Sequence, residues 1–165
     1  MAVLKADIFI KLDGIEGESQ DDKHKNEIEV QSFSFGVTNT GSHAAGGGGG
    51  SKHSHIGDVH FTKFVDKSSP KLFLACATGD TIKKAELTFR KAGQKAGQLE
   101  YYKITLSDLL VSSFQQSDSS GHDLGTEQVS LNFSKIEFDY KEQKPDGSLG
   151  GSVKSGYDIK HAKSV

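Results

Sequence analysis

Four histidines lie close together in the sequence and raise the question of a metal site: His43, His53, His55 and His60. His53 and His55 are two residues apart, so on a β-strand their imidazoles, which are common zinc ligands, would share one face. Asp58 is the nearest carboxylate, but no cysteine or second carboxylate completes a ligand set there. We interpret the histidines as an exposed strand face beside a loop, and we predict no metal site.

Five consecutive glycines, Gly46 to Gly50, invite comparison with a phosphate-binding loop. Such a loop requires a glycine directly before lysine, followed by Ser or Thr at the head of a helix. Here Ser51 separates Gly50 from Lys52, and the residues that follow alternate like a strand. The sequence therefore predicts no nucleotide site.

The remaining candidates for chemistry are also weak. No serine lies in a G-x-S-x-G turn, and the acidic residues between Asp13 and Asp22 lack the ligand spacing of a helix-flanked calcium loop. The single cysteine, Cys76, lies in the apolar run 72–77, which favours a buried small hydrophobic residue over a catalytic thiol. We predict that the protein is not an enzyme and needs no cofactor.

The elements that carry these residues are mainly strands, because apolar and polar residues alternate along most of the chain. About eight strands are expected from the spacing of the alternating runs. In three of them the apolar parity slips by one residue, near residues 31–32, 101–102 and 134–135. A slip of this kind predicts bulged, strongly bent strands, as in a barrel or a corner-turning sandwich.

One short helix interrupts the strands. Ser69 is a suitable N-cap for this helix, and Pro70 suits its first turn. Gly79 is a suitable residue to end it. Leu72, Phe73 and Cys76 would then share one stripe. The fold class predicted is all-β with one short flanking α-helix, as a β-barrel or a tight two-sheet sandwich, in a single domain over residues 1–165.

The composition limits the classes of partner that the protein is expected to bind. The 165 residues include 20 basic and 22 acidic side chains, for a formal net charge of -2, so there is no positive field for nucleic acid or for a membrane surface. A single cysteine excludes an intramolecular disulfide. The first residues contain neither a basic region with an apolar core and cleavage site nor a transmembrane helix, which predicts no signal peptide and no membrane insertion.

Several segments, taken in order, resemble one known family. Residues 8–19 are a strand and an acidic turn, and residues 28–36 are a strand with paired aromatics. The other segments of the resemblance are residues 61–72, 85–93, 104–106, 111–113, 129–136 and 140–151. Together they resemble the Hcp family, the haemolysin-coregulated proteins of the bacterial type VI secretion system. Many relatives carry tryptophan near the paired aromatics, whereas this chain has none, so Phe33 and Phe35 are expected to fill that space.

The resemblance implies a structural function. Hcp proteins form hexameric rings that stack into a tube, which a contracting sheath on a baseplate expels together with the spike protein VgrG and small effector proteins bound in the lumen. The protein is therefore expected in the bacterial cytoplasm before export and outside the cell afterwards. Its expected partners are further copies of itself, VgrG, the sheath, the baseplate and effectors.

The resemblance also suggests positions for contacts. A projecting glycine-rich loop at about 39–55 is expected to contact a neighbouring subunit, because a glycine run is costly to order without a partner. Ser34 lies between Phe33 and Phe35, so it should point away from the core, toward the lumen and its effectors. The loop residues predicted at the contact are Asn39, Gly41, His43, Gly46, Gly50, Lys52 and His53.

Two other functions remain open at this point. One is a monomeric β-sandwich module that binds a ligand such as a carbohydrate, which would show an ordered surface platform of aromatic side chains. The other is a β-barrel enzyme with a metal held by His53, His55 and further ligands. The native mass of the purified protein separates the ring from both.

Overall fold

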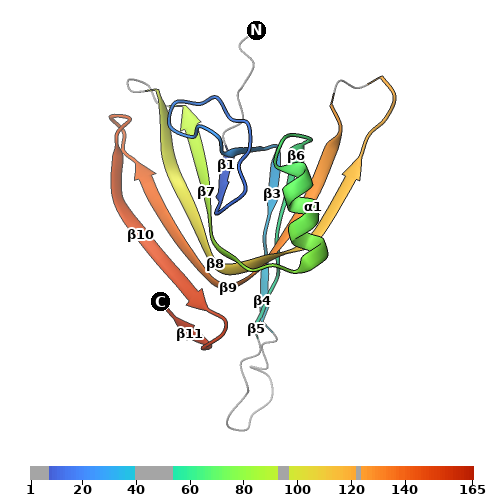
Figure 1. Ribbon diagram of the computed structural model, residues 1–165. Helices are drawn as coiled ribbons and strands as arrows, with labels where there is room; N and C mark the ends of the chain where they lie inside the picture. The colour runs from blue at the N-terminus through green and yellow to red at the C-terminus, as the bar shows by residue number, and fades with distance from the viewer. Residues whose placement is uncertain (1–7, 40–53, 93–96, 122–123) are drawn as a thin grey trace.

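The computed structural model describes residues 8–39, 54–92, 97–121 and 124–165, and most of them lie in strands (Figure 1). The elements in these residues are β1 (Ile8–Leu12), β2 (Ile28–Val30), β3 (Ser32–Ser34), β4 (Val37–Asn39), β5 (Ser54–Ile56), β6 (Val59–Phe64), α1 (Ser69–Thr78), β7 (Ile82–Ala92), β8 (Gln98–Ser117), β9 (Thr126–Gln143), β10 (Leu149–Asp158) and β11 (Lys163–Ser164). None of the described helices is long and apolar enough to cross a membrane.

The long strands β8 and β9 belong to both layers of a sandwich, and Figure 1 shows them turning together at the bottom of the view. The main sheet runs in the order β11-β10-β9-β8-β7-β1-β2. Beyond the turn, residues 126–131 of β9 pair with β8 on one side and with β6 on the other, and β6 pairs with β3. In the described part of the chain β2 and β11 do not pair with each other. The predicted sandwich is confirmed, and the closed barrel is wrong.

The predicted parity slips correspond to real irregularities. Phe89 of β7 pairs with Tyr102 of β8, whereas the next residue, Arg90, pairs with Glu100, so Tyr101 is an extra residue in β8. Near residue 31 the chain leaves one layer for the other: β2 pairs with β1, and β3 pairs with β6. A second bulge, between Val111 and Ser113 of β8, has no counterpart in the sequence prediction.

The slip at residues 134–135 has a different cause from the predicted bulge. The β8–β9 pairing keeps its register there, from Ser107 opposite Lys135 to Leu109 opposite Phe133. Both strands bend at this point, where Asp108 takes a left-handed backbone conformation with φ 48°. The Ser134 hydroxyl donates a hydrogen bond of 3.0 Å to the Asp108 carbonyl oxygen and holds the corner.

The helix begins and ends close to the predicted positions. Ser68, not Ser69, is the N-cap, with no side-chain capping bond, while Gly79 ends the helix with φ 70° and donates its N–H to the Ala75 carbonyl. Leu72 is fully buried and Cys76 packs against the core, but Phe73 is 59% exposed. The predicted stripe is therefore wrong at Phe73, because α1 turns Leu72 and Ala75 inward instead.

Phe33 and Phe35 contribute aromatic rings to the space between the two layers. The Phe33 ring meets Phe89 edge-on at 5.2 Å between centroids, and the Phe35 ring lies 6.0 Å from Phe138 and 6.2 Å from Phe133. Both side chains are half-buried and pack against the main cluster of buried residues. Two phenylalanines thus supply the apolar volume at this position.

The loop between β1 and β2 is held against the main sheet by a stack of three side chains. The His24 ring lies parallel to the Phe9 ring at 4.6 Å, and the Arg90 guanidinium lies 4.5 Å above the Phe9 centroid. Arg90 also donates two hydrogen bonds, of 2.8 and 3.1 Å, to the Asp21 carboxylate. His24 contacts carboxylates through both ring nitrogens, Glu27 at 2.5 Å and Glu100 at 2.8 Å.

The free energy of unfolding should fall at acidic pH, because protonation of Asp21 weakens its interaction with Arg90. The hydrogen bond from Arg90 holds the pKa of Asp21 below its ordinary value of 3.8, although burial opposes the effect. A carboxylate whose pKa is lowered by folding stabilises the native state above its unfolded pKa, and the contribution is lost as pH falls through the folded value. Chemical denaturation should therefore show the wild type to be more stable than Asp21→Asn at pH 6, and the difference should shrink as the pH falls below 3.8. A constant difference would contradict this role.

Candidate functional site

A polar groove of about 560 Å3 lies on the outer face of the layer that contains β3 and β6. It runs across four strands, with Ser34 at one side and Gln115 at the other. Neighbours on a strand point to opposite faces, so the buried residues Phe61, Val129 and Leu131 alternate with the polar residues that reach the groove. The polar lining residues are Ser32, Ser34, Asp58, His60, Thr62, Ser112, Ser113, Gln115, Gln128 and Ser130.

Short hydrogen bonds link these side chains across the strands. Asp58 accepts bonds from the Ser112 hydroxyl at 2.6 Å and from the Asn132 amide at 2.8 Å. Ser32 and Thr62 share a bond of 2.5 Å between their hydroxyl groups. The lining polar groups are thus partly satisfied by one another, and the groove presents a surface of mainly hydroxyl and amide side chains.

The groove contains one pairing that resembles part of a hydrolytic site. His60 Nδ1 lies 2.6 Å from the Ser130 hydroxyl, as a base would lie beside a nucleophile. A third group is needed to orient the base, but the nearest acid in the groove, Asp58, is bound by Ser112 and Asn132 instead. The geometry favours a structural hydrogen bond between two exposed strand residues.

The orientation predicted for Ser34 agrees with the structure. Ser34 is exposed and lines the groove, while Phe33 and Phe35 pack against the core. Sequence reasoning missed the rest of the groove, although the signal was available. Gln128, Ser130 and Asn132 alternate with apolar residues along β9, so they share one polar face.

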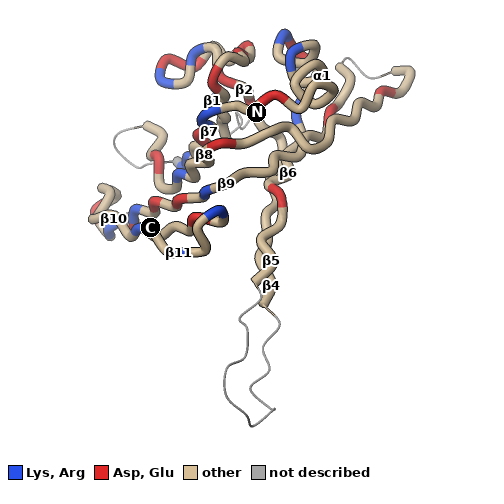
Figure 2. The backbone as a smooth tube through the Cα atoms, turned by 60° about the horizontal axis from the view of Figure 1, so that its bottom comes forward, with Lys and Arg blue, Asp and Glu red and all other residues tan. Residues whose placement is uncertain are grey.

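Most of the predicted loop contact lies outside the described residues, namely Gly41, His43, Gly46, Gly50, Lys52 and His53. Asn39 is exposed at the end of β4, opposite Ser54 of β5. These two strands form an arm that projects from the sandwich, and Figure 2 shows it without Lys, Arg, Asp or Glu. His55 is exposed on this arm. Among the described side chains, no group of three or more His, Cys, Asp or Glu residues could hold a metal ion.

Comparison with known proteins identifies the family of this chain. Residues 9–140 match the family model described as "Type VI secretion system effector, Hcp". The chain belongs to the Hcp family. A curated relative, Protein hcp1 of Pseudomonas aeruginosa, is 49% identical over 158 residues, which are 95% of this chain and 97% of that protein.

Solved structures agree with this assignment along almost the whole chain. The crystal structure of Hcp1 from Salmonella typhimurium has a TM-score of 0.80 at 39% identity and covers 98% of this chain and 100% of that one. A second structure, described as "Structure of a type six secretion system protein", has a TM-score of 0.88 at 30% identity and covers 96% of this chain and 99% of that one. The chain is thus a type VI secretion protein, and the resemblance seen in its sequence is confirmed.

Proposed function

We propose that this Hcp protein forms hexameric rings that stack into the inner tube of a type VI secretion system. The tube is assembled in the bacterial cytoplasm on a baseplate, expelled by a contracting sheath and capped by the spike protein VgrG. Small effector proteins bind inside the ring and leave the cell with it. In this proposal the chain contributes surfaces for assembly and cargo, and it catalyses no reaction.

The observation that supports a ring most directly is the state of two strand edges. In the described part of the chain, β3 pairs only with β6, and residues 110–117 of β8 pair only with β9. The layer β3-β6-β9-β8 therefore ends in unpaired backbone N–H and C=O groups on both sides. Such edges pair readily with another chain. If each copy presents its β8 edge to the β3 edge of the next, the layers join into a closed sheet.

A closed sheet of this kind has the polar groove on one face. Because the opposite face of the layer is the hydrophobic core, the groove would line either the lumen or the outside of the ring. We place it in the lumen, since small hydroxyl and amide side chains leave room for cargo and can exchange hydrogen bonds with many protein surfaces. Ser34 then faces the effector.

In this proposal the β4–β5 arm and the loop that it carries contact a neighbouring subunit. The arm leads directly into residues 40–53, which include the glycine run. Removal of Gly46 to Gly50 should leave the strand content unchanged by circular dichroism and should weaken ring formation or stacking in electron micrographs. Normal rings, stacks and secretion from the shortened protein would show that the loop is a passive linker.

The oligomeric state tests the proposal as a whole. Native mass spectrometry of the purified protein at micromolar concentration should show six copies, and electron microscopy should show rings with a central hole. A monomer at every concentration would instead favour the ligand-binding sandwich.

The groove itself is tested by a bulky residue at Ser34. Ser34→Trp should leave the hexamer intact, because Ser34 is exposed, but the indole would occupy the space in front of the groove. Effector recovered with the ring should fall about tenfold, equivalent to about 1.4 kcal/mol. Ser119→Trp, at an exposed position outside the groove, is the matched control. Equal effector recovery from the two variants would argue against this face as the cargo surface.

A further inference from the structure

The helix α1 carries an exposed apolar surface, which we call the helix patch. It consists of Phe73 and Leu74, whose side chains are 59% and 56% exposed. The buried residues of α1 hold its other side against the sandwich, and Phe73 reaches Phe114 of β8 with 6.4 Å between ring centroids. The helix patch therefore lies beside the half of β8 that has an unpaired edge.

A second exposed apolar surface lies on β9 and β10, and we call it the open aromatic face. Tyr140 and Val153 are paired across these strands and are 41% and 68% exposed. Tyr102 joins them from β8, with 6.4 Å between its ring and the Tyr140 ring. Phe138 lies 6.1 Å from Tyr102 and 6.0 Å from Phe35, which follows β3. This surface therefore lies on the side of the molecule where the β3 edge is unpaired.

The open aromatic face continues the hydrophobic core, and no other element in the described part of the chain covers it. Alternate residues of β9 share one face, so Ile136, Phe138 and Tyr140 point the same way. Ile136 is 2% exposed, Phe138 is half-buried and Tyr140 is 41% exposed, so coverage falls steadily along the strand. A strand face that begins in a core and ends in exposed aromatic side chains is typical of a protein interaction site.

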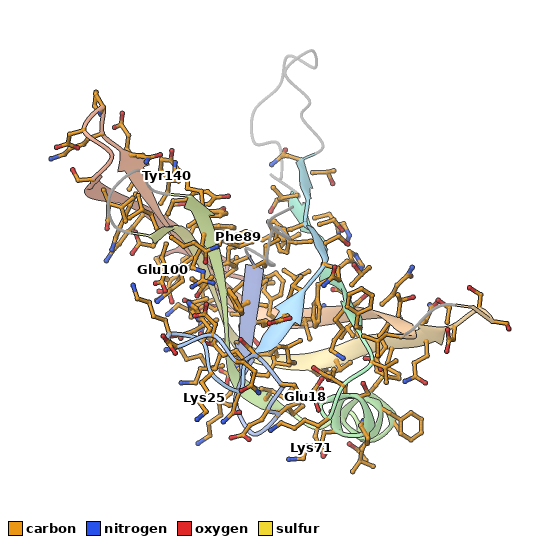
Figure 3. All side chains as sticks on the ribbon, turned by 90° about the horizontal axis from the view of Figure 1, so that it is seen from above. Glu18, Lys25, Lys71, Phe89, Glu100 and Tyr140 are labelled. Atoms are coloured by element: carbon orange, nitrogen blue, oxygen red, sulfur yellow. The ribbon has the colours of Figure 1, made fainter. Side chains whose placement is uncertain are left out.

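The two surfaces cannot cover each other within one molecule. Figure 3 shows Lys71, which lies on α1 two residues before Phe73, and Tyr140 on opposite sides of the molecule. Each surface also sits beside a different unpaired strand edge, the helix patch beside β8 and the open aromatic face beside β3. Two different patches on two sides of one chain suit a head-to-tail contact between copies.

We propose that the helix patch of one copy packs on the open aromatic face of the next copy. This inference rests on the ring proposed above and assigns the apolar anchors of its subunit contact. A charge pair is available across this contact: Lys71 is the charged residue of α1, and Glu142 follows Tyr140 on the same face of β9, while Lys154 beside Val153 has its own partner in Asp139. Partly exposed aromatic side chains such as Phe73 and Tyr140 can each bury on the order of 100 Å2. They would form the centre of an interface whose strand edges supply the rest of the roughly 800 Å2 per partner that a stable contact needs.

The direct test removes the helix patch. The double variant Phe73→Glu, Leu74→Glu places two carboxylates where the open aromatic face of the next copy would pack. Native mass spectrometry should show loss of the hexamer, with monomer as the main species, while circular dichroism matches the wild type because both side chains are exposed. Leu124→Glu is the matched control, since Leu124 is 55% exposed on the β8–β9 connection and belongs to neither patch. It should keep the hexamer.

Cross-linking tests which surfaces meet. In a Cys76→Ala background, the double variant Leu74→Cys, Val153→Cys should form disulfides between copies on mild oxidation and give a ladder of up to six chains on a non-reducing gel. Each single cysteine variant should stay largely uncross-linked, because a head-to-tail contact does not bring identical residues together. Efficient dimers from a single variant would instead indicate a two-fold contact and would overturn the proposal.

The outcomes separate this inference from the ring itself. A hexamer that survives the two glutamates and gives no ladder would overturn the assigned contact and leave the ring proposal standing. A wild-type protein that is monomeric at every concentration would overturn both. A hexamer that retains mass but no longer binds the sheath would assign the helix patch to that partner instead.

Discussion

Replacing Lys63 by methionine should lower the free energy of unfolding by about 3–5 kcal/mol, because it leaves buried carboxylates without their cation. The Lys63 side chain is fully buried beneath the start of α1. Its ammonium lies 2.8 Å from Glu127, which is also fully buried, and 2.9 Å from Asp66. It also donates a 2.8 Å bond to the Phe64 carbonyl. Urea denaturation at neutral pH measures the loss.

Two further variants show whether the unpaired charge is the cause. Adding Glu127→Gln to Lys63→Met removes the buried negative charge, while the amide can still bond to Gln116, which lies 2.8 Å from Glu127 in the wild type. The double variant should recover part of the loss. Lys71→Met, at an exposed position on α1, should change stability by less than about 0.5 kcal/mol. A loss below about 1 kcal/mol for Lys63→Met would contradict a strong buried pair.

In the ring proposed above, this ion-pair cluster would also matter for assembly, because it holds the start of the helix that carries the helix patch. Asp66 and Ser69, both in contact with Lys63, lie in the turn before α1 and at its first residue. A loosened helix start would move Phe73 and Leu74 relative to the strand edge of β8. We therefore expect Lys63→Met to weaken the proposed hexamer as well as the fold.

Gly17→Ala is expected to be the other strongly destabilising change, at about 1–3 kcal/mol and near the upper end of that range. A Cβ atom at Gly17 would lie 2.5 Å from the Glu27 carbonyl oxygen and 2.7 Å from the Ile28 Cα. Both are backbone atoms, so they cannot swing away as a side-chain end could. The two arms of this loop are also bonded to each other, with the Gly17 N–H donating to the Asn26 carbonyl at 2.8 Å.

The matched control is Gly36→Ala. A Cβ atom there meets nothing within 4 Å, so the change should be close to neutral or should stabilise slightly by restricting the unfolded chain. Thermal unfolding of the two variants beside the wild type is the measurement. Equal melting temperatures for the two variants would show that the β1–β2 loop shifts freely and does not depend on its contact with β2.

Local patterns in the sequence predicted much of the fold correctly because their causes are local. Strand alternation depends on neighbouring residues, so the buried apolar positions of β9, such as Val129, Leu131 and Phe133, could be assigned in advance. The end of α1 at Gly79 follows from the ease with which glycine adopts a left-handed conformation. The extra residue at Tyr101 was detectable because a bulge changes which face of a strand is buried.

Other features depended on contacts between distant parts of the chain. Nothing near Lys63 in the sequence indicates that Glu127, 64 residues away, will be buried beside it. The same holds for Arg90 and Asp21, which are 69 residues apart. Phe73 was assigned to the core because its spacing suits a helical stripe, but the direction in which α1 faces is set by packing of Leu72 and Ala75 on the sandwich.

For the functional surfaces, the sequence by itself determined the family, the face on which Ser34 lies and the absence of recognisable catalytic motifs. The tertiary structure alone decided that β8 and β9 bend into both layers, which within the described residues leaves two strand edges unpaired and the aromatic face of β9 and β10 uncovered. The reason is physical. Alternation reports which side of a strand is apolar, whereas the cover for that side comes from elements that are distant in sequence or from another copy of the chain.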